Sequence, residues 1–546
     1  MRVTFDGVII GAGPNGLALG AYMARAGLRV LVLDRRYEIG GGLATEEVTL
    51  PGFYHDTHAI YHMMVEYAPP LKDLELGTRY DLKWIYPEVQ VVMPFADGEY
   101  LALYRDPERS YESIKRFSQR DAETFREFAE LSQKAMDIFL APASYVNPSP
   151  SFEQLAKLEA HPIMKRMEEI CPTGKSPKEI VEDLFENDRV RALFLYLATM
   201  WGLDHDLEGL GYLVPLMINR GWHFRLCHKG SHHLAHLLGR VIVENGGMIW
   251  AGLPIKRIVL KDGEASGVEL EDGTVVEATK FVACSLNPHQ TFFELIDRDT
   301  TRQISPELVT RVEEWRYSDW SFFTVHLALR EPPHFKVAEK APELDRALIY
   351  VVGYEGEEDL IRHFEATKRG ELYDGGFNCC FPTLFDPIRA PQGYHIGLIS
   401  MECAPYNLKE GGPEAWYSVR EEYAQRCLST LQRYVSNLKA DVILGRYIST
   451  PLDTENKFLN MRQGCFKSGA YLPLQMGYFR PNELCSRHDT PIKKLYLCGS
   501  SSHSGGMITF GPAFCAIEKI AEDLGIDKWW PEPECVRVAR QEGLLD

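Results

Sequence analysis

A glycine-rich turn near the start of the chain has the spacing of a phosphate-binding loop. It follows the apolar run Val8-Ile9-Ile10 directly and fits the pattern G-x-G-x-x-G. In such a turn Gly11 permits the sharp bend, Gly13 lets the backbone approach a pyrophosphate, and Gly16 lets the next helix pack closely against the strand. The N-terminus of that helix offers free N–H groups and a positive dipole end to phosphate oxygens. The residues that we expect to bind a dinucleotide here are Gly11, Gly13, Pro14, Asn15 and Gly16.

An acidic residue lies where a ribose would be bound. A helical pattern over residues 17–24 is followed by an apolar run over residues 29–33, which predicts a second strand that ends at Asp34. A carboxylate in this place can accept hydrogen bonds from ribose hydroxyls. The following segment adds a second flexible stretch of backbone beside the first loop. The further residues that we expect at the ligand are Arg35, Gly40, Gly41, Gly42 and Thr45.

A second loop of small residues lies close to the other end of the chain. Residues 495–497 predict a strand, residues 499–507 are mostly small, and residues 513–521 predict a helix. This order of strand, small loop and helix again suits a close approach of backbone to anionic oxygens. The residues that we expect to contact the same ligand are Gly499, Ser500, Gly506 and Met507.

The N-terminal motifs together resemble those of a known family. The run from Val32 to Asp34, the pair Gly40-Gly41, Thr45-Glu46-Glu47 and Pro51-Gly52-Phe53 look like the phytoene dehydrogenase-like FAD oxidoreductases. This broad family includes carotenoid desaturases and isomerases, retinol saturase and PYROXD-type proteins, and it is akin to the amine oxidase superfamily. The resemblance implies FAD as the cofactor, with Asp34 on the adenosine ribose and Gly40-Gly41 near the phosphates.

The resemblance also assigns two later segments and shows three departures. It implies that the strand beginning at Ile255 passes the adenine and that the loop over residues 499–507 closes over the flavin. The family more often has Glu at the position of Asp34. It has a double glycine where this chain has Gly230-Ser231, and His-Pro where this chain has His503-Ser504.

We therefore expect an α/β fold in which a Rossmann-type FAD-binding domain is assembled from discontinuous segments. The remaining chain would form a substrate-binding domain of mixed sheet and helices. Its first part reads as mostly helical beyond residue 107, and its second part contains strand-like runs at 322–329 and 396–401. The expected segments are 1–70, 225–290 and 455–546 for the FAD-binding domain, and 71–224 and 291–454 for the substrate-binding or cap domain.

The motifs present, and those missing, narrow the redox chemistry. A second G-x-G-x-x-G after a strand and a C-x-x-C pair do not occur in the sequence, which argues against a disulfide reductase that takes electrons from NAD(P)H. We expect dehydrogenation, or desaturation, of a C–C bond in an apolar or ring-containing small molecule by hydride transfer to flavin. Oxygen, a quinone or a carrier protein would then accept the electrons. The alternatives are a redox-neutral isomerase of a polyene or unsaturated acid, a flavin amine oxidase, and a flavin-containing scaffold without turnover.

A proton must leave the carbon next to the one that gives the hydride, and a side chain can take it as a general base. His503 is the first candidate because it lies in the loop expected nearest the flavin. Tyr54 and His55, with His58, follow the Pro-Gly-Phe motif and are alternatives. In the competing interpretation, His503 only hydrogen-bonds the cofactor or the backbone.

Two apolar stretches, residues 193–201 and 211–218, could line a pocket for a large apolar molecule, although such stretches are more often core. His228, His232 and His236 recur every four residues. No carboxylate is interleaved with them, so we expect no metal site.

Composition excludes several classes of protein. The chain has 546 residues and a formal net charge of −18, which makes it a poor candidate for nucleic-acid binding. Its twelve scattered cysteines read as buried side chains in a reducing compartment. The N-terminus shows no signal-peptide pattern, so we expect a cytoplasmic protein whose local patches could still contact a membrane surface.

Overall fold

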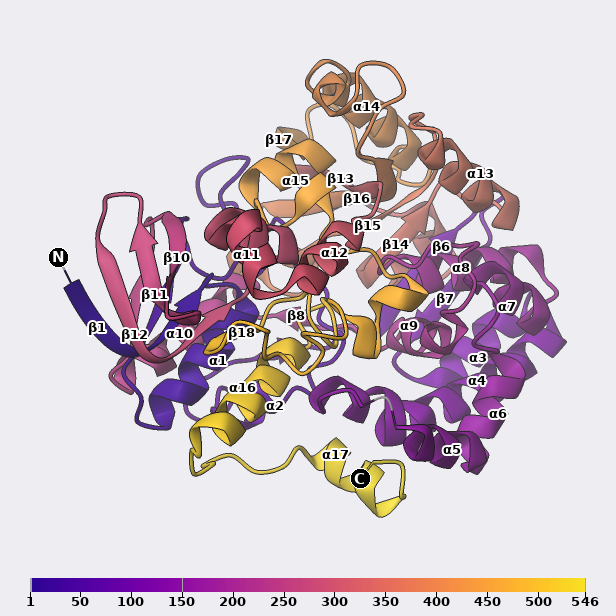
Figure 1. The fold of residues 1–546 in the computed structure, drawn as a ribbon. Coiled ribbons are helices and arrows are strands. Elements are labelled where there is room, and N and C mark those ends of the chain that lie inside the picture. The colour runs from indigo at the N-terminus through magenta and orange to yellow at the C-terminus, as the bar shows by residue number, and fades with distance from the viewer. Residues whose placement is uncertain (1, 150, 546) are drawn as a thin grey trace.

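The computed structural model describes residues 2–149 and 151–545 and contains two seven-stranded sheets (Figure 1). The first sheet lies near the N-terminus and has the strand order β10-β11-β12-β1-β2-β9, with β18 paired to β12. Its strands are β1 (Arg2–Ile10), β2 (Val30–Leu33), β9 (Met248–Trp250), β10 (Ile255–Lys261), β11 (Glu264–Leu270), β12 (Val275–Cys284) and β18 (Leu495–Leu497).

The centre of this sheet is parallel. Strand β1 pairs in parallel with β2 and β12, β2 with β9, and β12 with β18. The carboxyl ends of these strands therefore meet at one edge of the sheet, where α/β proteins bind their ligands. Gly11 follows β1, Asp34 follows β2, Ser285 follows β12, and Gly499 comes two residues after β18. Four segments that are distant in sequence thus converge on one edge.

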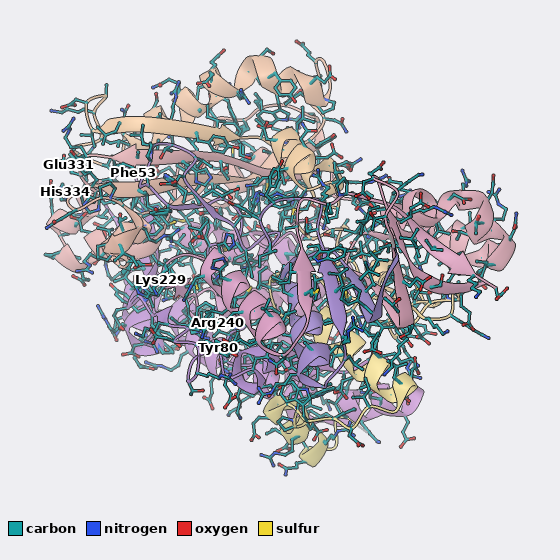
Figure 2. The ribbon with its side chains drawn as sticks, turned by 90° about the vertical axis from the view of Figure 1, so that its left-hand side faces the viewer. Phe53, Tyr80, Lys229, Arg240, Glu331 and His334 are labelled. Carbon is teal, nitrogen blue, oxygen red and sulfur yellow. The ribbon has the colours of Figure 1, made fainter. Side chains whose placement is uncertain are left out.

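Helices cover one face of the first sheet. Helix α1 (Pro14–Arg25) packs between α10 (His232–Glu244) and α16 (Gly511–Leu524). A Cβ atom on Gly20 of α1 would lie only 2.8 Å from a methyl carbon of Val32 in β2, so the helix approaches the sheet closely. On the outer side of α10, the guanidinium of Arg240 lies 5.2 Å from the ring centroid of Tyr80 (Figure 2).

The second sheet has the order β17-β13-β16-β15-β14-β6-β7. One face packs against α14 (Trp416–Leu431) around a core that includes Phe323, Tyr350 and Trp416. The opposite face, called the inner face below, turns toward the helical block and the chain around Tyr61. The strands are β6 (Val89–Pro94), β7 (Tyr100–Tyr104), β13 (Trp320–Leu329), β14 (Ala347–Val352), β15 (Phe377–Cys380), β16 (His395–Pro405) and β17 (Ile443–Ser449).

A block of helices packs beside the inner face (Figure 1). It confirms the expectation of a mostly helical segment beyond residue 107. Strands β6 and β7 precede it and join the second sheet, which sequence analysis did not anticipate. The helices of this block are α3 (Pro107–Lys115), α4 (Gln119–Ala135), α5 (Phe152–Ala160), α6 (Pro162–Ile170), α7 (Pro177–Leu184), α8 (Asp188–Thr199) and α9 (Val214–Arg220).

Short elements complete the chain. Strand β3 pairs with β4, and β5 with β8, in two separate antiparallel two-stranded sheets. The bounds of these strands and of the remaining helices are β3 (Thr45–Glu46), β4 (His55–Asp56), β5 (Trp84–Ile85), β8 (Leu226–Cys227), α2 (Pro69–Asp73), α11 (Arg298–Ile304), α12 (Pro306–Glu314), α13 (Glu357–Lys368), α15 (Pro451–Lys457) and α17 (Glu534–Gln541).

The apolar stretches 193–201 and 211–218 lie mainly in the core of the helical block. Trp201 and Tyr212 are only half-buried, whereas Leu193 to Met200 are buried, so the core interpretation holds for most of both stretches. All cysteines are free thiols and, apart from the half-buried Cys535, they are buried as expected. In the described part of the chain, no helix has the length and apolar character needed to span a membrane.

Candidate cofactor and active site

A cavity of about 360 Å³ lies at the carboxyl edge of the first sheet. Both glycine-rich loops, from opposite ends of the chain, contribute to its lining, and so do residues that follow β2, β9 and β12. Its size is that of a small-molecule site. The residues predicted to bind the dinucleotide that line this cavity are Gly11, Gly13, Pro14, Asn15, Asp34, Arg35, Gly41, Gly42, Ile255, Gly499, Ser500, Gly506 and Met507.

Three of the predicted residues lie outside the lining and have packing roles instead. A Cβ atom on Gly16 would lie 2.0 Å from the carbonyl oxygen of Gly11, so the helix can leave the turn only with glycine here. Gly40 has a φ of +107°, and a Cβ atom there would lie 2.5 Å from the carbonyl oxygen of Leu43. The hydroxyl of Thr45 donates a hydrogen bond to Asp56 Oδ1 at 2.6 Å. These residues shape the loops rather than face the cavity.

The glycine turn that begins at Gly11 and the segment from Gly40 to Gly42 pack closely against each other. Gly13 caps α1 with extended backbone, and a Cβ atom built on it would meet no protein atom within 4 Å. A Cβ atom on Gly41 would lie 3.1 Å from the Cα atom of Gly13. A larger residue in place of Gly13 would therefore project its side chain into the cavity, where a pyrophosphate at the N-terminus of α1 would lie.

The carboxylate of Asp34 is held by the backbone and still has acceptor capacity. Its Oδ2 accepts a hydrogen bond from the N–H of Ala12 at 2.8 Å, and its Oδ1 accepts one from the N–H of Arg36 at 2.9 Å. An ionised carboxylate offers about four acceptor positions. The remaining positions suit a diol such as a ribose, so the residues present fit a dinucleotide with a free ribose.

One wall of the cavity escaped the sequence analysis. The segment from Lys457 to Met461, with Phe466, lines the cavity together with the glycine loops. The guanidinium of Arg35 donates a hydrogen bond to the carbonyl oxygen of Lys457 at 2.9 Å and thereby ties this wall to the end of β2. The segment carries no motif. Ser285 could have been found, because it follows the carboxyl end of a parallel strand.

His503 lies outside the cavity lining. Its Nε2 atom hydrogen-bonds the carbonyl oxygen of Ala143 at 2.8 Å, and burial lowers the pKa of the imidazole to about 4. Its Nδ1 atom is buried without a hydrogen-bond partner. The imidazole thus joins the C-terminal loop to the segment before residue 145, an arrangement that favours a positioning role over proton transfer.

The other candidate bases are also placed away from the lining. Tyr54 is 43% exposed on the surface. His55 is buried, its Nε2 atom lies 2.8 Å from the hydroxyl of Thr49, and burial next to His326 lowers its pKa to about 2. The ring of His58 packs edge-on against Phe458 of the cavity wall at 4.5 Å, and burial holds its pKa well below the usual value. Of the candidates, His58 comes nearest to the cavity wall.

The histidines at four-residue spacing do not converge. His228 Nδ1 lies 2.9 Å from Asp386 Oδ1, whereas His232 and His236 stack edge to face at 5.4 Å. Among the residues that the structure describes, His, Cys, Asp and Glu side chains form no group of three suited to hold a metal ion.

Comparisons with known proteins agree with this geometry. Residues 9–74 match the family model described as an NAD(P)-binding Rossmann-like domain. One of the subunits of limonene dehydrogenase from Castellaniella defragrans is 38% identical, over 99% of this chain and 98% of that protein. A phytoene desaturase (lycopene-forming) of Pseudescherichia vulneris is 24% identical over 95% of this chain and 99% of that protein. An engineered putrescine oxidase shares the fold, with a TM-score of 0.61, 15% identity and coverage of 96% of this chain and 99% of the other.

The fold, the site and a sequence similarity that extends over nearly the whole chain define the class of this protein. It is an oxidoreductase with a dinucleotide-binding Rossmann-like domain. The chain belongs to the phytoene dehydrogenase-like family of FAD-dependent oxidoreductases. The predicted family and the predicted α/β fold class are confirmed. The chain falls among oxidoreductases that act on CH–CH groups.

Proposed function

We propose that this chain binds FAD and dehydrogenates a C–C bond of an apolar, ring-containing hydrocarbon. The observation that carries the proposal is the cavity that two glycine-rich loops build from opposite ends of the chain. The similarity to a limonene dehydrogenase supports the substrate class, because limonene is a cyclic hydrocarbon. The similarity to phytoene desaturase supports the reaction type.

The residues that would hold FAD follow from the geometry of the cavity. Asp34 would accept hydrogen bonds from the adenosine ribose, and the N-terminus of α1 at Gly13 would receive the pyrophosphate. Ile255 lines the same end of the cavity as Asp34 and would lie beside the adenine. Ser500 and Met507 of the C-terminal loop also line the cavity, and we place the flavin ring beside them. Bound there, the flavin supplies the hydride acceptor that no side chain can provide.

The surroundings of this part of the cavity suit an apolar substrate. Phe466 of the cavity wall packs against Phe322 of β13 with ring centroids 4.4 Å apart. Farther along the inner face, Phe224 contacts both Tyr61 and Trp201 at 5.7 Å. Phe322, Phe466, Tyr61 and Trp201 are only half-buried although they belong to the interior. We place the hydrocarbon among these rings, which would exclude water and orient a C–H bond toward the flavin.

The substrate proton would have to be taken by a polar group close to these aromatic rings. His503 remains the first candidate base from the sequence, but its low pKa and its bond to Ala143 argue for a role in holding the loop. The inner face carries another polar chain, because the hydroxyl of Tyr61 donates to Asn378 Oδ1 at 3.2 Å and Asn378 Nδ2 donates to the hydroxyl of Tyr196 at 2.9 Å. The pKa values of Tyr61 and Tyr196 are raised by burial, so both hydroxyls stay protonated and this polar chain would position the substrate rather than take its proton.

Anaerobic reduction of the flavin tests the proposal. Protein loaded with FAD is mixed with cyclic and acyclic hydrocarbons without oxygen, and loss of the oxidised flavin absorbance is followed together with the product mass. We expect bleaching by a ring-containing hydrocarbon and a product two hydrogens lighter. A product of unchanged mass would instead identify an isomerase, and release of an aldehyde from an amine would identify an amine oxidase. Oxygen, quinones and carrier proteins can then be compared as electron acceptors of the reduced protein.

A further inference from the structure

Two cations are buried behind the C-terminal glycine loop without a carboxylate partner. Lys467 is 1% exposed and Arg480 is fully buried. Lys467 Nζ donates a hydrogen bond to the carbonyl oxygen of Gly202 at 2.7 Å. The guanidinium of Arg480 donates to the carbonyl oxygens of Ser500 at 2.8 Å and of Lys467 at 2.9 Å. In the part of the chain that the structure describes, every hydrogen-bond partner of these two side chains is neutral.

Aromatic rings surround the ammonium group of Lys467. Its Nζ atom lies 4.8 Å from the ring centroid of Trp320, 5.2 Å from that of Tyr471 and 5.5 Å from that of Phe466. The electron-rich faces of such rings attract a cation, and the attraction grows when water is absent. Burial lowers the pKa of Lys467, whereas the nearby carboxylate of Asp204 is among the groups that oppose this shift. The rings and the Asp204 carboxylate therefore oppose the loss of charge that burial favours.

These charges lie directly behind the wall of the cavity. Phe466, Ser500 and Gly506 line the cavity, and the Cα atom of Lys467 is 3.6 Å from the position that a Cβ atom on Gly506 would take. Arg480 Nε lies 3.7 Å from the corresponding position on Gly505. The loop over residues 499–507 therefore separates the two cations from the part of the cavity where we place the flavin ring.

We propose that Lys467 and Arg480 act as a buried pair of positive charges that stabilises the negative charge gained by the cofactor when it accepts a hydride. A hydride carries two electrons and one proton, so a neutral flavin ring that takes it up becomes negative by one charge. Fixed charges in a water-poor site act strongly on such a change, because little solvent screens them. This inference rests on the proposed function, since it requires that FAD occupies the cavity.

Sulfite binding measures this stabilisation without any substrate. Sulfite adds to oxidised flavin and leaves the ring with a negative charge, so its dissociation constant reports the field at the ring. In the FAD-loaded protein, Lys467→Met should weaken sulfite binding at least about 10-fold, which corresponds to about 1.4 kcal/mol. The midpoint potential should fall in parallel by about 30 mV for a tenfold change in a two-electron couple. Lys467→Arg, which keeps the charge, should remain within a few-fold of the wild type.

Two further variants control this result. Lys368→Met removes an exposed lysine that is ion-paired with Asp206 near the same turn, and it should leave sulfite affinity unchanged because solvent screens that charge. Asp204→Asn keeps the oxygen that accepts a hydrogen bond from Trp320 Nε1 at 2.9 Å but removes a negative charge that opposes the field. Because the Asp204 carboxylate also raises the pKa of Lys467, the variant is compared with the wild type at successively lower pH, where Lys467 is protonated in both proteins. There it should tighten sulfite binding a few-fold, which tests the proposal even if Lys467→Met fails to fold.

The outcomes separate this inference from the proposed function. Wild-type protein that takes up no FAD would overturn both. FAD-loaded protein in which sulfite affinity and midpoint potential are the same for the wild type, Lys467→Met and Asp204→Asn would overturn the role of the buried cations alone. Opposite shifts for Lys467→Met and Asp204→Asn, with Lys368→Met unchanged, would support it.

Discussion

The guanidinium of Arg35 donates a hydrogen bond to the carbonyl oxygen of Lys457 at 2.9 Å, although 422 positions separate the two residues in sequence. Arg35 follows the second parallel strand, and Lys457 ends α15 beside the far wall of the cavity. The bond thus joins the end of β2, where Asp34 lies, to the part of the cavity wall that α15 and the following residues form.

Gly13→Val should abolish FAD binding in a folded protein. The added side chain meets no protein atom within 4 Å and would fill the space that the pyrophosphate needs. FAD content after reconstitution, measured from the absorbance of the released flavin, checks this result. Gly174→Val is a matched control, because a Cβ atom there also meets nothing within 4 Å but lies in a loop remote from the cavity lining. Normal FAD content in folded Gly13→Val would contradict the placement.

Asp34→Ala should weaken FAD binding by about 10- to 100-fold, on the order of a lost charge-assisted hydrogen bond. It also frees the N–H groups of Ala12 and Arg36, which the carboxylate now holds. Asp34→Glu should retain most of the affinity, because a carboxylate at this position still reaches a ribose. Titration with FAD, followed by flavin fluorescence, measures both variants. If Asp34→Ala and Asp34→Glu lose the same amount of FAD affinity, the conformation of the loop around Asp34, and not the carboxylate, determines FAD binding.

His503→Ala distinguishes a base from a loop support. Because the imidazole bonds the carbonyl oxygen of Ala143 outside the cavity, we expect FAD affinity to fall. The rate of flavin reduction, normalised to bound flavin, should stay within a few-fold of the wild type. Stopped-flow reduction with the substrate that bleaches the flavin makes this measurement. A normalised rate lower by about 10²–10⁴-fold at normal FAD content would instead identify His503 as the general base.

Acid should destabilise the protein partly through the same imidazole. Its pKa in the folded protein is about 4, below the ordinary value of about 6.5, so the unfolded chain binds a proton more readily. The stabilisation is therefore complete above about pH 6.5 and is lost as the pH falls toward 4, by about 2 kcal/mol at pH 5. His503→Gln removes this titration. The difference in unfolding midpoint between pH 7 and pH 5 should be smaller for His503→Gln than for the wild type, and equal differences would contradict the assignment.

The part of the site built by residues 8–34 could be predicted from the sequence because its residues follow one another along the chain in a fixed order. Strand, glycine turn, helix and acid follow one another within residues 8–34, and each step has a steric or electrostatic reason. The same logic found the loop at residues 499–507. Gly16, Gly40 and Thr45 belong to the right loops but face away from the cavity, a distinction that depends on which side of a turn points outward.

The rest of the site could not be predicted in this way. Phe458 and Phe466 line the cavity because α15 and the chain after it fold back against β2, and no local pattern announces such a contact. The four candidate bases were chosen because they lie in or beside the motifs in sequence, whereas in the structure His503 bonds Ala143 and His55 lies beside Thr49. The domain boundaries near residues 70, 225, 290 and 455 and the catalytic roles stay predictions.

The position of β18 has a consequence for how the protein matures. This strand joins the first sheet beside β12, and the loop and α16 that follow it complete the cavity. A chain emerging from the ribosome can assemble the strands β1, β2, β9 and β12 long before residues 495–524 are made. The proposed FAD site is therefore incomplete until residues 495–524 have been made and have joined the first sheet, so FAD would bind after this sheet has formed rather than guide its assembly.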